Sequence, residues 1–333
     1  MSVPDSAGRG GLSRRQVIAL GAGLFTVALV PAALRRGRRR LVTRTIPVMG
    51  TLAEVAVVHD DVGLAQSAID AAFDRLRWVD RTMTRYSATS DVGRVNAGAA
   101  RDAVAVHPAT ALVIGAALRW AEASEGRFDP GLARVIEVWD VGHRQAPPPA
   151  AGFRRLAGRH LYRSVVVDRR GAQPVVRLDD RDAGIDLGGI AKGYAVDLAV
   201  QALRDAGVAD AIVNAGGDLY AMGRSADGDR WQVGIQSPAD PSRVAETLEL
   251  EDAALATSGD YLQGFDFQGR RYHHILDPET AEPRVAVSHS VTVRAARCLD
   301  ADAAATTVFG MAGASAGELL AVQGRGAEIV SRI

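Results

Sequence analysis

The apolar positions of the chain follow two periods, and the period distinguishes predicted strands from predicted helices. Residues 52–58 have the spacing of a β-strand. Residues 64–83 carry apolar side chains every three or four positions, which is typical of an amphipathic helix. A second helix is predicted from Pro108, a residue suited to the first helical turn, to a stop at Gly126, and three prolines at 147–149 mark a loop.

Short strands dominate the rest of the chain. They are predicted at 164–168, 175–178, 211–213, 219–222, 231–236, 248–250, 288–295 and 327–330. Helices are predicted between a glycine-rich segment at 186–194 and Gly207, and at 300–311 and 314–322. Runs of strands with helices grouped between them favour an α+β fold with mainly antiparallel sheets. Because no linker divides residues 41–333, we expect them to form one two-lobed domain.

The composition is that of an ordinary globular protein, with 47% hydrophobic and 23% charged residues among 333. This balance excludes a disordered, collagen-like or multi-pass membrane protein. Eight arginines and one acid lie in residues 1–40, so residues 41–333 carry 31 basic and 38 acidic side chains and a net charge of −7. A body with this charge is not an electrostatic nucleic-acid binder, and we expect no nucleic-acid partner.

The first 40 residues predict an export signal rather than a part of the fold. Arg14 and Arg15 precede an uncharged, apolar stretch at 17–34, which is the layout of a twin-arginine signal. The twin-arginine translocase reads such a pair as an address, which predicts a protein in the periplasm or on the outer face of the cytoplasmic membrane. About 18 apolar residues also just reach the length of a membrane span, so a retained signal anchor or a Sec signal is the alternative.

The segment 186–194, with the sequence DLGGIAKGY, has the features of a phosphate site. Its small residues let the backbone approach a ligand closely, and a helix begins there, so backbone amides point toward an anion. Lys192 adds an ammonium group and is the only lysine in the chain. The pattern matches neither the dinucleotide-binding motif nor the Walker motif. A glycine-rich turn packed tightly on a sheet is the alternative interpretation.

Two further segments carry candidate catalytic chemistry. Asp302 and Thr306 are four residues apart in a predicted helix, so their oxygens share a face and can bind one hard cation, magnesium or calcium. His273 and His274 precede Ile275, and imidazole is the side chain best able to accept a hydroxyl proton near neutral pH. A solvated acidic helix start and a packed core histidine are the respective alternatives.

A set of motifs occurs in a characteristic order between residues 46 and 312. The motifs are MGT at 49–51, MTRYS at 83–87, GRFDP at 126–130, DLGGIAKGYAVD at 186–197, NAGGDLYAMG at 214–223, ALATSGDY at 254–261, YHHILDP at 272–278 and ADAAATT at 301–307. In this set the chain resembles the ApbE family of flavin transferases. The resemblance implies a two-lobed α+β fold of the ApbE type.

The resemblance also implies site residues at the matching positions. Contacts to FAD are expected from Met49, Tyr86, Arg127, Phe128, Asp129, Asp186, Lys192 and Ile275. Magnesium is expected on the Gly189 carbonyl, Asp302 and Thr306, and His274 matches the family's proposed catalytic base.

The chain departs from the family pattern at two positions. Ala305 stands where some members have a second aspartate, so we expect fewer protein ligands on the metal. Ala281 stands where the family usually has a glycine, which leaves the geometry of that turn open.

The activity that the resemblance implies is a magnesium-dependent protein flavinylation. A threonine or serine hydroxyl of an exported acceptor protein would take FMN from FAD, and AMP would leave. Two alternatives stay open. One is a periplasmic flavin-binding or flavin-donor protein without transferase activity, and the other is a magnesium-dependent FAD pyrophosphatase that yields FMN and AMP.

Overall fold

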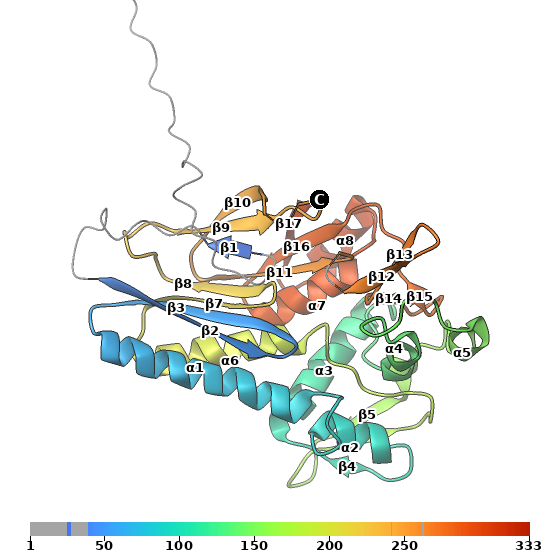
Figure 1. Ribbon diagram of the computed structural model, residues 1–333. Helices are drawn as coiled ribbons and strands as arrows, with labels where there is room; N and C mark the ends of the chain where they lie inside the picture. The colour runs from blue at the N-terminus through green and yellow to red at the C-terminus, as the bar shows by residue number, and fades with distance from the viewer. Residues whose placement is uncertain (1–24, 28–38, 241, 262) are drawn as a thin grey trace, which may run out of the picture.

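The computed structural model describes the backbone of residues 25–27 and residues 39–240, 242–261 and 263–333. Its central feature is a seven-stranded sheet in which every neighbouring pair is antiparallel, in the order β17-β16-β11-β8-β7-β3-β2 (Figure 1). The strands are β2 (Arg40–Val48), β3 (Thr51–His59), β7 (Asp210–Ala215), β8 (Asp218–Met222), β11 (Ala253–Gly259), β16 (Ser290–Ala295) and β17 (Glu328–Arg332).

Different layers cover the two faces of this sheet (Figure 1). Three helices pack along one face: α1 (Val62–Met83), α6 (Ala191–Asp205) and α7 (Cys298–Val308). A smaller sheet covers the other face: β1 (Phe25–Val27), β9 (Trp231–Gln236) and β10 (Val244–Leu250). In β3, Val55 and Val57 belong to the core beneath the helices, whereas Ala56 and Val58 belong to the core beneath β9. Burial on both faces explains the continuous apolar character of this strand.

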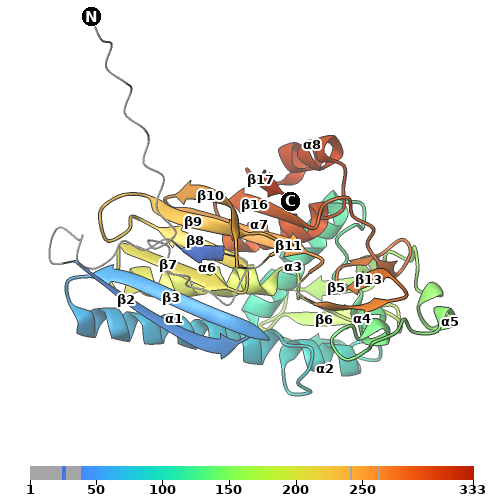
Figure 2. The same ribbon diagram turned by 45° about the horizontal axis from the view of Figure 1, so that its top comes forward.

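A second lobe lies beside the large sheet (Figure 2). Its elements are α2 (Asp91–Gly98), β4 (Val104–Ala105), α3 (Pro108–Ala123), α4 (Ala133–Trp139), α5 (Ala150–Arg154), β5 (Val165–Asp168) and β6 (Val175–Leu178). The remaining elements are two hairpins, β12 (Gly264–Phe267) with β13 (Arg270–His273) and β14 (Leu276–Asp277) with β15 (Glu282–Pro283), and helix α8 (Gly313–Gln323). One hydrophobic core runs through both lobes and contains side chains of α1, α3, α4, α6 and α7.

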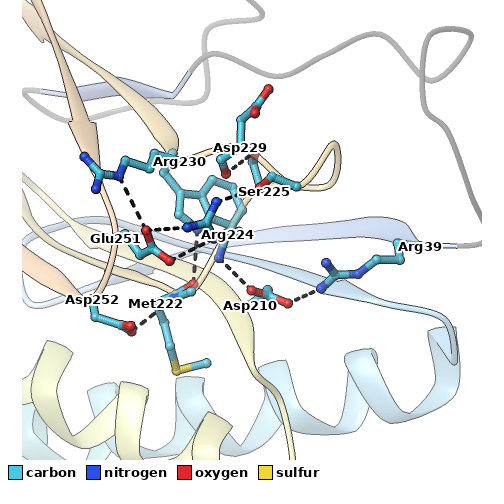
Figure 3. Close-up of polar contacts among 12 residues, drawn as sticks. Arg39, Asp210, Met222, Arg224, Ser225, Asp229, Arg230, Glu251 and Asp252 are labelled. Atoms are coloured by element: carbon cyan, nitrogen blue, oxygen red, sulfur yellow. Dashed lines mark hydrogen bonds and ion pairs between the residues drawn. The ribbon is translucent and has the colours of Figure 1, made fainter.

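A polar network closes one end of the large sheet (Figure 3). Arg224, just after β8, donates to both carboxylate oxygens of Glu251 at 2.8 and 3.0 Å, and its backbone amide donates to Asp210 at 2.6 Å. The indole of Trp231 donates to the carbonyl of Met222 at 3.1 Å. These bonds tie the start of β7 and the end of β8 to β9 and to the β10–β11 turn. The candidate catalytic residues lie at the opposite end of the sheet.

The predicted α+β fold with mainly antiparallel sheets is confirmed. The predicted helices correspond to α1, α3, α6, α7 and α8, with ends that shift by a few residues. Several elements were not predicted, among them strands β2 and β11, helices α2, α4 and α5, and the hairpin strands β12 to β15. β11 has the sequence AALATSG, whose small residues have little strand preference, and α2 contains two glycines and an asparagine. Tertiary packing therefore decides the structure of these segments.

The predicted export signal lies mostly outside the described residues. Within it, the backbone of Phe25–Val27 forms β1, which pairs antiparallel with β9. The described chain resumes at Arg39, which forms an ion pair with Asp210. Across the described ranges, no helix combines the length and the apolar character that a membrane span requires.

Candidate active site

The ends of several elements meet at the end of the large sheet opposite to the network of Figure 3. The β2–β3 turn lies beside the β7–β8 turn, because Ala53 pairs with Ala215. Gly216 has a φ of 62°, and a Cβ there would lie 2.5 Å from Oγ1 of Thr51, so the close approach requires glycine. Helix α6 begins at this end because it leads back to the start of β7, and α7 ends here because it follows β16 (Figure 1).

Lys192, in the first turn of α6, contacts two acidic side chains. Its Nζ forms an ion pair with Asp218 and lies 3.7 Å from Oδ1 of Asp302. The side chains of the two acids are only 2% and 4% exposed. Burial alone would lower the pKa of Lys192, but the two nearby carboxylates outweigh it and raise this pKa, so the ammonium stays charged. Lys192 thus follows directly after the Gly188–Gly189 turn, and in this structure its charge is balanced by carboxylates.

The three predicted metal ligands lie where α6 meets α7. Oδ2 of Asp302 accepts a hydrogen bond from the amide of Gly193 at 3.0 Å. One turn later, the hydroxyl of Thr306 lies 3.4 Å from the hydroxyl of Ser258. The backbone of Gly189 packs directly on Thr306, since a Cβ at Gly189 would lie 3.0 Å from its Oγ1. Carboxylate, hydroxyl and carbonyl oxygens are the donors that a hard cation prefers.

A carboxylate-rich metal centre is not present in the described part of the chain. There, no three His, Cys, Asp or Glu side chains cluster in a way that could hold a metal ion. A cation beside Asp302 would therefore depend on hydroxyl and carbonyl groups, and on water or phosphate oxygens. Ala305, where some family members have a second aspartate, is fully buried in α7 and offers no ligand.

The two neighbouring histidines have different roles in the structure. His273 is buried, its Nδ1 accepts from the amide of Ile275 at 3.2 Å, and its Nε2 therefore donates to the carbonyl of Arg284 at 2.9 Å. Among the described residues, the ring of His274 has one weaker contact, from Nδ1 to the carbonyl of Gln263 at 3.4 Å. A proton on Nδ1 suits this contact and leaves Nε2 free to accept another proton.

Burial changes the acid–base behaviour that the sequence alone suggests for His274. Desolvation, with smaller contributions from the charges of His273 and Lys192, lowers the pKa of His274 to about 4. The imidazole is therefore neutral, and able to accept a proton, throughout the neutral range. A change of protonation near pH 6.5, the ordinary value, is not expected.

Asp186 and Tyr86, two of the predicted FAD contacts, are connected through Arg85. Asp186 accepts from the amide of Gly188 at 2.8 Å and forms an ion pair with Nε of Arg85 at 2.8 Å. The Arg85 guanidinium stacks on the ring of Tyr86, with its carbon 4.3 Å from the ring centre, and donates to the phenol oxygen at 2.9 Å. The Tyr86 side chain nevertheless remains 82% exposed. An open aromatic ring beside the site is suited to stacking on a planar ligand.

Met49 has an unusual backbone conformation at the β2–β3 turn. Its φ is 54°, in the left-handed region that side chains other than glycine seldom adopt. The amide of Met49 donates to a carboxylate oxygen of Asp80, on the last turn of α1, at 3.2 Å. This contact holds the strained turn against the helix, and it places Met49 at the same end of the sheet as Lys192.

The segment Arg127, Phe128 and Asp129 lies against α7 and Gly189. Phe128 is buried, and a Cβ at Gly189 would lie 3.1 Å from its ring. The Arg127 side chain, for which the resemblance predicts a contact to FAD, donates to the carbonyls of Thr307 and Phe309 at 3.0 and 2.9 Å. Burial raises the pKa of Asp129 to about 6, and its Oδ2 has no hydrogen-bond partner among the described residues.

Hydrogen bonds hold both Ile275, the last of the predicted FAD contacts, and the turn at Ala281, where the family usually has a glycine. Ile275 is buried between the hairpins, and its carbonyl accepts from the amide of Arg284 at 3.0 Å. Ala281 has a φ of 55°, so it adopts the left-handed conformation that glycine would adopt more easily. Its amide donates to Asp277 at 2.7 Å and its carbonyl accepts from Trp139 at 2.6 Å. The substitution therefore leaves the turn intact.

Four residues of this region received no role from the sequence: Asp80, Arg85, Asp218 and Arg284. Asp218 had a detectable signal, because it follows the Gly216–Gly217 turn within a recognised motif. Asp80 and Arg85 lie on or just after an ordinary amphipathic helix, where charged residues usually face water. Their roles depend on tertiary contacts that periodicity does not reveal.

Comparison with known proteins agrees with the geometry. Residues 49–330 match the profile of the ApbE family. The chain belongs to the ApbE family. The predicted resemblance is thereby confirmed. Among curated proteins, the chain is 33% identical over 294 residues to the FAD:protein FMN transferase of Treponema pallidum, with 82% of this chain and 80% of the relative covered. It is 31% identical over 268 residues to the enzyme of the same name from Vibrio cholerae, with 80% of both chains covered.

Solved structures of ApbE proteins share the fold. The crystal structure of the ApbE protein from Thermotoga maritima superposes with a TM-score of 0.78 at 30% identity, covering 87% of this chain and 93% of that one. The flavin transferase ApbE from Vibrio cholerae superposes with a TM-score of 0.73 at 28% identity, covering 85% and 90%. The two-lobed arrangement is thus similar over nearly all of the described chain.

Proposed function

We propose that this protein is an FAD:protein FMN transferase that uses Mg²⁺ to transfer FMN from FAD to a threonine or serine hydroxyl of an exported acceptor protein, with release of AMP. One observation carries the proposal. In a chain of the ApbE family, whose curated relatives are named for this activity, an ammonium, a helix-borne carboxylate and a hydroxyl gather at one end of the sheet. A histidine with a free nitrogen lies near enough for the charge of Lys192 to act on it.

The residues at the junction of α6 and α7 fit a magnesium ion. Asp302, Thr306 and the Gly189 carbonyl supply oxygen donors, and none of these three donors is the thiolate or imidazole that would favour zinc. When bound there, Mg²⁺ would neutralise negative charge on the pyrophosphate of FAD. Lys192 keeps a positive charge beside Asp302 and would stabilise the phosphate that leaves with AMP.

His274 is the group in this region best placed to move a proton. As the acceptor hydroxyl oxygen bonds to the FMN-side phosphorus, Nε2 of His274 would take the hydroxyl proton. The bond between that phosphorus and the bridging oxygen breaks, and the oxygen leaves as part of AMP. The carbonyl of Gln263 holds Nδ1 and so orients the ring.

The pyrophosphatase and flavin-donor alternatives differ from transfer in their products. Chromatography of a reaction with FAD and Mg²⁺, run with and without an acceptor domain, separates the three. We expect AMP in proportion to flavin attached to the acceptor. Equal amounts of free FMN and AMP without acceptor would favour the pyrophosphatase, and unchanged FAD in both reactions would favour flavin binding alone.

We also propose that the protein acts after export by the twin-arginine route, in the periplasm or on the outer face of the cytoplasmic membrane. The support is the Arg14–Arg15 pair followed by an apolar stretch. Its acceptor would then be an exported protein as well, since both must meet in the same compartment.

A further inference from the structure

Arg284 is a buried arginine that makes no ion pair with a carboxylate in the described chain. Only 5% of the residue is exposed. A buried charge without a counterion is costly, so its hydrogen bonds must compensate for the lost hydration. Burial, together with the nearby charge of Arg127, lowers the pKa of Arg284 to about 9, which still leaves it protonated at neutral pH.

The guanidinium of Arg284 binds the C-terminal end of α7. Its Nη1 donates to the carbonyls of Thr306, Thr307 and Phe309 at 2.6, 3.3 and 3.2 Å. These carbonyls lie in the last helical turn or just beyond it, where no further turn of helix can supply an amide. The helix dipole also makes this end partly negative, which favours a cation. Arg127 donates to two of the same carbonyls, so two guanidinium groups hold one helix end.

The same residue is joined to two other segments of the candidate site. Its Nη2 donates to the carbonyl of Arg127, at the start of the GRFDP motif. Its backbone amide donates to Ile275 at 3.0 Å, and its carbonyl accepts from His273 at 2.9 Å. His274 lies between these two backbone anchors. Arg284 therefore connects the end of α7, which carries Thr306, with the segment that carries His274.

We propose that Arg284 is a positioning residue, which fixes the metal-binding end of α7 relative to the His274 segment. The proposal rests on the proposed function, because the importance of that relation comes from the transfer reaction. Loss of the guanidinium would leave the Thr306 carbonyl without its side-chain donor and the Thr307 and Phe309 carbonyls to Arg127 alone, which would allow the Thr306 turn to shift. A displacement of about 1 Å at reacting groups can lower a rate about 100-fold.

The experiment compares Arg284→Met and Arg284→Lys with the unchanged protein and with Arg169→Met. Arg169, an exposed residue, is the control, because its guanidinium also donates to a helix carbonyl, that of Ala111 in α3, away from the site segments. For each folded variant we would measure kcat and KM for FMN transfer, and the affinity for Mg²⁺ by calorimetry. Calorimetry reports on the metal site without relying on turnover.

We expect Arg284→Met to lose about 10- to 100-fold in kcat and in Mg²⁺ affinity, with a much smaller change in the KM for FAD. Arg284→Lys should recover part of the loss, because an ammonium retains the charge but cannot reach all three carbonyls. It also provides the test if Arg284→Met fails to fold. Arg169→Met should match the unchanged protein in both measurements.

Two results would overturn the role of Arg284. One is a folded Arg284→Met or Arg284→Lys with unchanged kcat and unchanged Mg²⁺ affinity. The other is an equal loss in Arg169→Met, which would indicate general destabilisation. Failure of the proposed function looks different, because the unchanged protein itself would then transfer no FMN.

Discussion

At the scale of single residues, His274 is distinguished from His273 by its free ring nitrogen. We expect His274→Ala to keep FAD bound but to slow single-turnover transfer by about two to four orders of magnitude, as loss of a general base does. Because burial lowers its pKa to about 4, the unchanged protein should show no acidic decline attributable to this group between pH 5 and 9. The rate should fall only as the pH approaches 4, where the ring becomes protonated.

The exposed His143 provides a control for this experiment, and His143→Ala should leave the pH profile unchanged. Equal rates for His274→Ala and the unchanged protein would reject the base assignment. An acidic limb near pH 6.5 that disappears only in His274→Ala would keep the base but contradict the effect of burial.

Asp302 is the one carboxylate among the proposed metal ligands. We expect Asp302→Asn to abolish transfer while it weakens FAD binding much less, because the lost charge serves the metal and most of the flavin contacts lie elsewhere. Thr306→Val should act in the same direction but less severely, since a neutral hydroxyl contributes less to a hard cation. Transfer assays and flavin titrations in matched buffers, with and without a chelator, would check both variants. FMN transfer that persists in excess chelator would mean that the reaction does not require Mg²⁺.

At the scale of residues, the sequence pointed to candidates where a residue type is rare, a motif is long or the spacing is helical. Lys192 stood out as the only lysine, and Asp302 and Thr306 stood out by helical spacing. The sequence did not reveal that Asp218 would share the ammonium, or that the Arg127 guanidinium would bind carbonyls of α7. Both facts depend on contacts between segments about 25 to 180 residues apart, which no local pattern encodes.

At the scale of elements, Gly193 sets the distance between α6 and α7. A Cβ there would lie 2.2 Å from the carbonyl oxygen of Cys298, far inside contact distance. We expect Gly193→Ala to lower the free energy of unfolding by about 1 to 3 kcal/mol, because the helices must separate. Transfer should fall as well, since the amide of Gly193 binds Asp302. Urea denaturation gives the first quantity and a transfer assay the second.

Gly317, inside α8, is the matched control. A Cβ there would meet nothing within 4 Å, so Gly317→Ala should be neutral or should stabilise the helix by about 0.5 to 1 kcal/mol. If Gly193→Ala were as stable as Gly317→Ala, the close packing of α6 on α7 would not be a constraint on this fold.

Helices and strands could be predicted from the sequence where their apolar side chains recur at a regular interval. The 22 residues of α1 bury a regular stripe of side chains, and the predicted helix agrees closely with the observed one. Edge strand β2 is largely exposed or half-buried, and β11 consists of small residues, so neither carries a clear pattern. Both are strands because neighbouring strands supply their hydrogen-bond partners.

At the scale of the whole molecule, the predicted twin-arginine export signal can be tested separately from FMN transfer. We expect Arg14→Lys combined with Arg15→Lys to retain the protein in the cytoplasm, because the translocase reads both guanidinium groups. Cell fractionation followed by immunoblotting gives the measurement, with the unchanged protein in parallel. An unchanged periplasmic yield would mean that another type of signal directs export.

The proposed transfer attaches FMN covalently to an acceptor protein. The most direct test is therefore to measure the mass of an acceptor domain before and after the reaction. The protein would be incubated with FAD, Mg²⁺ and an exported flavin-acceptor domain that contains a candidate threonine. The mass of the intact domain would then be measured by mass spectrometry. A second sample would carry valine in place of that threonine. We expect the first domain to gain the mass of one FMN phosphoester, the second to gain none, and AMP to appear in an amount equal to the attached FMN. An unmodified first domain, in the presence of bound FAD and Mg²⁺, would contradict it.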